Sequence, residues 1–250
     1  MTFADHFSAV AARYAAYRPT YPWELIDVLA DRSPAGPVWD VGCGTGQLSS
    51  ALTARFQHVI ATDPAQAMLD SATPASGVEY RRGSAEASDL PDASIALVVA
   101  AQAAHWFDWP RFTAEAARVA MPGALIALIS YGIAIVEGDE ANSIVSRYYR
   151  DDVGSFWPAG RAHVENGYRD LVLPWPAVDV PQLEMTASWT LDELLGYITT
   201  WSATVKMIAV RGTGALEAMH TALAEAWPVE QRRTIRWPLT AKLARYFPAN

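Results

Sequence analysis

Between residues 38 and 131, short apolar runs alternate with segments in which apolar residues recur every three or four positions. The first pattern is typical of buried strands and the second of amphipathic helices. Five strands, each with its flanking turn or loop, are predicted from the runs VWDV, HVIATD, VEYRRGSAE, SIALVVAAQ and MPGALIALISYG. Helices are predicted through about residue 54 and over residues 64–72 and 110–120. This alternation predicts an α/β fold with a doubly wound, mostly parallel sheet and right-handed crossovers.

The pattern differs on both sides of this region. Residues 4–18 have helical spacing, the prolines of RPTYP interrupt it, and a second helix is predicted over residues 23–30. After residue 136 we predict helical structure over 141–150, a strand near 182–190, helices over 191–204 and 214–227, and a last strand over 233–247. The prediction is one domain over residues 1–250, made of an N-terminal helical lid (1–36), a cofactor-binding core (37–136), cap insertions with one core strand near 180–189 (137–228) and a final strand (229–250).

Composition narrows the classes of function. The chain has 250 residues, 51% of them apolar and 18% charged, which suits a large buried core. A formal charge of −8 argues against nucleic acid or an anionic membrane as the partner. Cys43 is the single cysteine, which excludes an intramolecular disulfide and a multi-cysteine zinc site, and no metal is expected. The N-terminus lacks a signal-peptide pattern and the most apolar stretch, residues 124–136, is too short for a bilayer. We expect a soluble cytoplasmic monomer or homodimer that acts on a small molecule.

A glycine-rich loop follows the first predicted strand, in VWDVGCGTGQLSS. Its spacing is G-x-G-x-G, whereas the dinucleotide fingerprint would need a glycine where Gln47 stands, and a Walker loop would need a lysine. Asp40, just before the loop, would repel a phosphate but attract a cationic amine. Asp63 ends the next strand, where a carboxylate can accept hydrogen bonds from ribose hydroxyls. A ligand with an ammonium group, a ribose and no phosphate fits these features, and S-adenosylmethionine is such a ligand.

Four stretches, VWDVGCGTGQLS, ATDPAQAML, RRGSAEASDLPDASIALVVAAQAAHWFD and RFTAEAARVAMPGALIALI, resemble the class I S-adenosylmethionine-dependent methyltransferases, in particular the type 11 branch. They cover roughly residues 38–131. YAAYRPTYP resembles a subgroup that includes trans-aconitate methyltransferase and other small-acid carboxyl methyltransferases. One departure is MPGA, where the family usually has a second glycine in place of Ala124. The resemblance implies a seven-stranded, Rossmann-like methyltransferase fold.

The resemblance also implies a set of cofactor-binding residues. These are Asp40, Gly42, Gly44 and Gly46 around the methionyl part, Asp63 at the ribose, Met68 on the adenine, Ser84, Ala85 and Glu86 at the adenine edge, Gln102 near the sulfonium, and Arg18 as a clamp for a carboxylate of the cofactor or the acceptor. Other interpretations stay open: Asp63 as a helix cap, Met68 as ordinary core, and Arg18 as a surface residue before a turn.

Residues expected at the acceptor lie in AAHWFDWP and in the N-terminal helix. His105 is a candidate general base, because imidazole titrates near neutrality, or else a structural histidine. Trp106 is expected to wall the pocket, and Tyr14 and Tyr17 to contact the acceptor from a lid. No Asn-Pro-Pro-Tyr-like sequence follows the fourth strand, which argues against DNA or protein amide substrates. We expect O-methylation of a small molecule, with a carboxylate as one candidate. The alternatives are C-, N- or S-methylation and a non-catalytic cofactor-binding protein.

Overall fold

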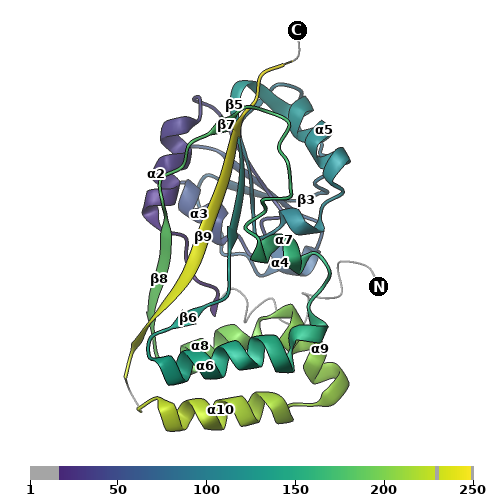
Figure 1. The fold of residues 1–250 in the computed structure, drawn as a ribbon. Helices are drawn as coiled ribbons and strands as arrows, with labels where there is room; N and C mark the ends of the chain where they lie inside the picture. Colours follow the sequence, from purple (N-terminus) through teal and green to yellow (C-terminus); the bar gives the residue numbers. More distant parts are fainter. Residues whose placement is uncertain (1–16, 229–230, 249–250) are drawn as a thin grey trace.

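The computed structural model describes residues 17–228 and 231–248. Its centre is a twisted sheet with the strand order β3-β2-β1-β4-β5-β9-β6 (Figure 1). The parallel strands are β1 (Val38–Val41), β2 (Val59–Asp63), β3 (Val78–Arg82), β4 (Ile95–Ala101) and β5 (Ala120–Tyr131). The long β9 (Arg233–Arg245) closes this series antiparallel to β5. The α/β, doubly wound, mostly parallel fold predicted from the sequence is confirmed.

The sheet has nine strands in the described residues, not the seven expected. The reason is the length of β9, which spans 13 residues and pairs with more than β5. Its second half also pairs with β7 (Ala177–Val178), and its first half pairs with β6 (Ile135–Val136) and β8 (Glu184–Trp189). β9 therefore runs from the core of the sheet into the cap.

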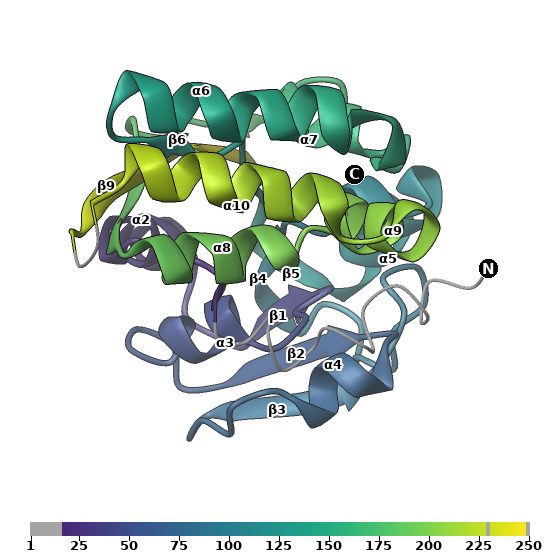
Figure 2. The same ribbon diagram turned by 90° about the horizontal axis from the view of Figure 1, so that it is seen from below.

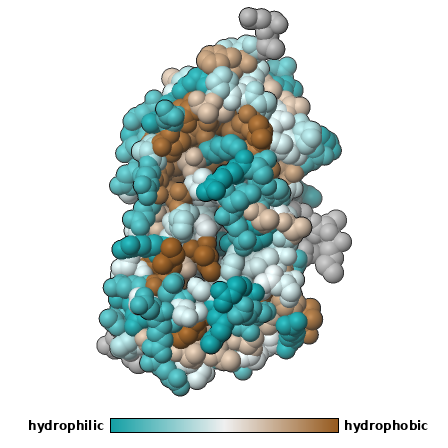
Figure 3. Space-filling model, in the orientation of Figure 1, coloured by the Kyte–Doolittle hydropathy of each residue, from teal (hydrophilic) through white to brown (hydrophobic). Residues whose placement is uncertain are grey.

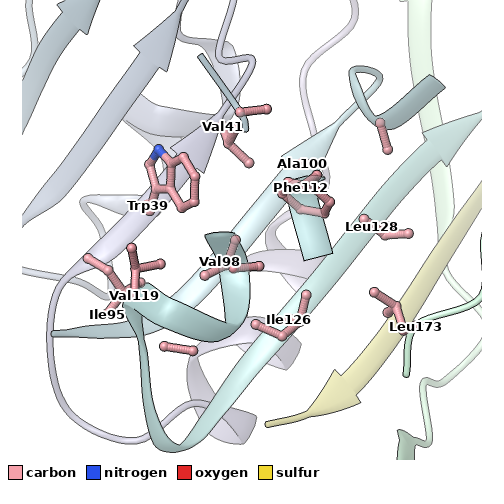
Figure 4. Packing of buried hydrophobic residues seen from close by; sticks show 14 of the residues in the cluster. Trp39, Val41, Ile95, Val98, Ala100, Phe112, Val119, Ile126, Leu128 and Leu173 are labelled. Atoms are coloured by element: carbon pink, nitrogen blue, oxygen red, sulfur yellow. The ribbon is translucent and has the colours of Figure 1, made fainter. Parts of the chain in front are cut away.

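Helices cover both faces of the parallel strands. On one face α2 (Trp23–Arg32) and α3 (Gln47–Leu52) pack against the side chains of alternate strand positions. On the other face α5 (Trp109–Val119) packs against Trp39, Val98 and Ile126 (Figure 4). Trp39 is fully buried, and its indole Nε1 donates a hydrogen bond to Thr62 Oγ1 at 2.8 Å. This hydrogen bond joins β1 and β2 directly below the glycine loop.

The cap is a helical layer at the carboxyl ends of the parallel strands (Figures 1 and 2). It contains α6 (Asp139–Arg147), α8 (Leu191–Thr199), α9 (Ser202–Arg211) and α10 (Gly214–Ala226), and α10 contacts both α6 and α8. The cap has its own hydrophobic core, to which Trp201, Trp227 and Trp237 contribute. On the face seen in Figure 3 the larger hydrophobic area lies in the upper half of the molecule, over the sheet. The three buried tryptophans of the cap therefore stabilise it from within.

Several predicted helices have different limits. The helix expected over 191–204 is two helices, because Trp201 between α8 and α9 has extended backbone and a buried side chain. The helix expected over 141–150 begins at Asp139 and ends at Arg147, and a π-helical turn (η4, Tyr148–Asp152) follows it. The helix expected over 64–72 is limited to α4 (Gln66–Asp70). The helix expected over 4–18 lies outside the described residues except for its last two.

Short elements connect the core to the cap. They are the 3-10 helices η3 (Ala104–Trp106) and η5 (Gly154–Phe156) and the helix α7 (Arg161–Glu165). No helix in the described part of the chain is long and apolar enough to span a bilayer. Within the same residues, no group of three His, Cys, Asp or Glu side chains is placed to hold a metal ion.

Candidate active site

A cavity of about 290 Å³ lies at the carboxyl ends of the parallel strands. In a doubly wound sheet this edge is the usual place for a ligand. The cavity is lined by ten of the eleven predicted cofactor-binding residues: Arg18, Asp40, Gly42, Gly44, Asp63, Met68, Ser84, Ala85, Glu86 and Gln102. Trp106, predicted at the acceptor, lines it as well. The fold thus brings these residues from the separate stretches to one place.

The glycine loop is held on β2 by backbone hydrogen bonds. The N–H groups of Gly42 and Cys43 both donate to the carbonyl of Thr62, at 2.8 and 3.0 Å. Gly42 has a φ of 72°, and a Cβ added there would lie 2.5 Å from the Cβ of Ala103. Only glycine fits this combination of left-handed backbone and close approach. The loop therefore packs directly against Ala103, the residue that precedes η3.

Asp40 is a fully buried acid in the wall of this cavity. Its Oδ2 accepts a hydrogen bond from Ser49 Oγ at 2.5 Å, whereas Oδ1 has no hydrogen-bond partner among the residues that the structure describes. The pKa of Asp40 is raised from 3.8 to about 7, mainly by burial and also by the nearby Asp63, although the Ser49 hydrogen bond opposes the change. A buried acceptor without a partner is unfavourable, so this atom is suited to a cationic ligand group.

Asp63, at the end of β2, joins the glycine loop to the start of α4. Its Oδ2 accepts from the backbone N–H of Gly44 at 2.9 Å, and its Oδ1 accepts from that of Ala65 at 2.8 Å. Burial raises the pKa of this carboxyl, and the two N–H donors oppose that change. Each carboxylate oxygen keeps further lone-pair capacity. Asp63 does not cap α4, because the N-cap residue of that helix is Ala65 and no side chain caps it. The carboxylate of Asp63 fixes the turn before α4 and lines the cavity.

The segment after β3 forms another wall. Ser84 Oγ donates a short hydrogen bond to Glu86 Oε2 and accepts one from the backbone N–H of Glu86. Glu86 Oε1 accepts from the backbone N–H of Asp108 at 3.0 Å, which links this wall to the residues after β4. Met68 is 4% exposed and lines the same cavity. Met68 is therefore a core residue that also forms part of the cavity wall.

Gln102 follows β4 in a left-handed conformation with a φ of 54°, which is uncommon for a residue other than glycine. Its backbone N–H donates to the carbonyl of Ile129 and its side-chain Nε2 to that of Tyr131, both at 2.8 Å. The two bonds to β5 hold the side chain at the cavity. Non-glycine backbone in this region often marks a functional site.

A second, smaller space of about 60 Å³ adjoins the main cavity, and we call it the inner chamber. Arg18, Gln102, Trp106 and Tyr131 line both spaces. The inner chamber is completed by Ile133, His105, Tyr149, Trp157, Pro158, Arg161, Tyr197, Trp201 and Ser202. Arg18 stands at the boundary, where its Nη1 donates to the hydroxyl of Tyr131 at 3.0 Å. The cap and the core therefore share one composite site.

His105 lines only the inner chamber, and its Nδ1 lies 2.9 Å from the hydroxyl of Tyr168. Burial, together with electrostatic interactions with Arg161 and His163, lowers the pKa of His105 to about 3. The expectation that this imidazole titrates near neutrality is wrong, because desolvation disfavours the imidazolium. At pH 7 His105 is neutral and a weak base.

Not all predicted residues line these spaces. Gly46 precedes α3, and a Cβ there would meet the ring of Tyr80, so its role in this structure is tight packing. Tyr17 packs against Gly196 of the cap rather than lining either space. Tyr14 lies outside the described residues.

Sequence reasoning missed Tyr131, Trp157 and Arg161 as lining residues. The signal for Tyr131 was available, since it ends a predicted strand at the ligand edge. Trp157 and Arg161 follow no periodic pattern, and only the fold brings them to η3.

Three comparisons place the chain among known proteins. A family model described as a methyltransferase domain matches residues 39–128. A solved structure from Anaeromyxobacter dehalogenans, assigned as a type II methyltransferase, is 40% identical with a TM-score of 0.85, covering 93% of this chain and 100% of that chain. A Dictyostelium discoideum protein assigned as a methyltransferase is 28% identical over 229 residues, 90% of this chain and 87% of that protein. An uncharacterized methyltransferase of Mycobacterium tuberculosis is 40% identical over 126 residues, 49% of this chain and 51% of that protein.

The matched residues of the family model include β1 with its glycine loop, β2 and β4, which build the main cavity. The similarity to the Anaeromyxobacter structure extends over the cap as well as the core. The chain therefore belongs to the class I S-adenosylmethionine-dependent methyltransferases.

Proposed function

We propose that this protein binds S-adenosylmethionine in the main cavity and directs methyl transfer to an oxygen of a small-molecule acceptor. The observation that carries the cofactor assignment is Asp40, whose Oδ1 is buried in the cavity wall with no hydrogen-bond partner in the described residues. A cationic amine is the ligand group that such an atom accommodates best. Asp40 therefore favours a cofactor with an amino-acid group at this position over a cofactor with a phosphate.

The remaining cavity residues suit the other parts of this cofactor. Asp63 retains lone pairs for ribose hydroxyls, and Met68 offers an apolar surface for a base. Ser84 and Glu86 supply polar groups beside it. When bound, S-adenosylmethionine supplies a methyl group already activated on a sulfonium, so no covalent catalysis by the protein is needed.

The task of the protein residues is then to position the acceptor and exclude water. The wall shared by the two spaces is formed by Arg18, Gln102, Trp106 and Tyr131. An acceptor held at this wall would face both the main cavity and the inner chamber. His105 is neutral and weakly basic in this environment. An acceptor oxygen that is already ionised at neutral pH needs no general base, which favours a carboxylate over an alcohol or an amine.

The test is calorimetric titration with S-adenosylmethionine, with NADH as a negative control. We expect micromolar binding that Asp63→Ala weakens at least tenfold, about 1.4 kcal/mol. Asp89→Ala is the matched control, because its side chain is 76% exposed and lines neither space. Absence of binding to the wild-type protein would refute the proposal. Binding would justify a screen of small acids and phenols for formation of S-adenosylhomocysteine.

A further inference from the structure

Arg161, at the start of α7, places a guanidinium in the wall of the inner chamber. Its Nε donates to the hydroxyl of Tyr149 at 2.8 Å, and its guanidinium carbon lies 4.6 Å from the ring centroid of Trp157. Glu165 is the nearest acid, with 3.8 Å between its Oε1 and that same Nε. In the described ranges, no hydrogen bond engages the two terminal nitrogens of Arg161. Two pairs of N–H donors are therefore available on a side chain that is 17% exposed.

Trp157 adds another donor to the same wall. Its indole Nε1 is buried and has no hydrogen-bond partner among residues 17–228 and 231–248. Leaving such a group unpaired is unfavourable, so a ligand acceptor would relieve an existing penalty. The ring is also fixed in place, because it packs against Tyr149 and Trp201.

His105 lines the same chamber, and its Nδ1 lies 2.9 Å from the hydroxyl of Tyr168, which holds the ring in place. We assign the tautomer in which this hydroxyl donates to Nδ1 and the imidazole proton is on Nε2. In this form the ring is a donor at Nε2.

The loop that carries Trp157 and Arg161 is held directly against η3. A Cβ added at Gly160 would lie 2.6 Å from the carbonyl oxygen of His105, so only glycine permits this approach. Among the described lining residues of the inner chamber there is no Asp or Glu, although the whole chain has a charge of −8. The described lining of the chamber thus carries the guanidinium groups of Arg18 and Arg161 and no acid, and Glu165 lies behind Arg161 and Tyr149.

We infer that the inner chamber is an anchoring site for a carboxylate of the acceptor, bound by Arg161, Trp157 and His105. This inference rests on the proposed function and names its substrate class, namely small acids. A planar guanidinium matches a carboxylate through two parallel hydrogen bonds. The chamber of about 60 Å³ has room for about four water molecules, which fits a carboxylate and its adjoining carbon. The three residues line the chamber and not the main cavity, so the anchored group is distinct from the oxygen that is methylated.

The experiment measures binding of matched acids and amides to the full-length protein saturated with S-adenosylhomocysteine. The probes are succinate and succinamide, benzoate and benzamide, and 4-hydroxyphenylacetate and 4-hydroxyphenylacetamide. We expect at least one acid to bind at least tenfold more tightly than its amide. Arg161→Gln should reduce that preference below threefold, Arg161→Lys should retain part of it, and Trp157→Phe should weaken the acid about threefold.

Arg150→Gln is the matched control, since Arg150 is 70% exposed, pairs with Asp151 and lines neither space. Affinity for S-adenosylhomocysteine, measured first in every variant, shows whether the variant is folded. If the wild type does not bind it, the proposed function fails. If the wild type binds it but no acid is preferred over its amide, or Arg161→Gln and Trp157→Phe both keep the full preference, the carboxylate site is overturned and the proposed function stands.

Discussion

Replacing Asp40 by asparagine separates the cost of a buried charge from its use in binding. Asparagine has nearly the same shape and its side-chain oxygen can still accept the hydrogen bond from Ser49. In the ligand-free protein the pKa of Asp40 is about 7 instead of 3.8. At about 1.4 kcal/mol per pH unit, ionising this buried group costs about 4 kcal/mol.

Proton linkage gives the direction in which the free energy of unfolding changes with pH. Between pH 4 and 7 the folded protein holds a proton on Asp40 that the unfolded chain has lost, so the free energy of unfolding falls as pH rises and becomes level above 7. Asp40→Asn removes this decrease. An unpaired amide N–H offsets about 1–3 kcal/mol of the gain. We expect Asp40→Asn to be more stable than the wild type at pH 8 by about 1–3 kcal/mol.

Ligand binding should change in the opposite direction. A bound ammonium group requires ionised Asp40, so affinity of the wild type for S-adenosylhomocysteine should fall up to tenfold per pH unit below 7. Asp40→Asn should bind at least tenfold more weakly at pH 8 and lose most of this pH dependence.

Urea unfolding and calorimetry at pH 5 to 8 measure both effects. Asp151→Asn serves as the exposed control. The reasoning about burial is refuted if Asp40→Asn has the same pH-dependent stability as the wild type. The assignment of the ammonium site is refuted if its ligand affinity at pH 8 is unchanged.

Three further predictions use other parts of the structure. Gly42→Ala should cost about 1–3 kcal/mol of unfolding free energy and weaken cofactor binding, because its φ is 72° and its Cβ would meet Ala103; unchanged binding in calorimetry would contradict this. His105 should show no titration between pH 5 and 8 in nitrogen-15 NMR, since burial lowers its pKa to about 3, and a midpoint near 6.5 would disprove it. Thr190→Ala should destabilise the protein by about 1 kcal/mol in urea unfolding, because Thr190 and Glu193 form a capping box at α8; Thr190→Ser should retain most of the stability.

Local patterns in the sequence determined the core of the fold and the cofactor side of the candidate site. Strand and helix periodicity is a local property, and the carboxyl ends of parallel strands must meet at one edge. Asp40, near the end of β1, and Asp63, at the end of β2, were therefore expected at one cofactor without any knowledge of the packing.

Tertiary structure decided the composition of the inner chamber. His105 and Trp106 were expected from the sequence, but Trp157 and Arg161 follow no periodic pattern and join His105 only because Gly160 packs against η3. The break between α8 and α9 at Trp201 and the extra pairings of β9 likewise depend on contacts with distant residues. The pKa values of Asp40 and His105 were also beyond sequence reasoning, because they are set by desolvation, which depends on everything that surrounds a side chain in the folded protein.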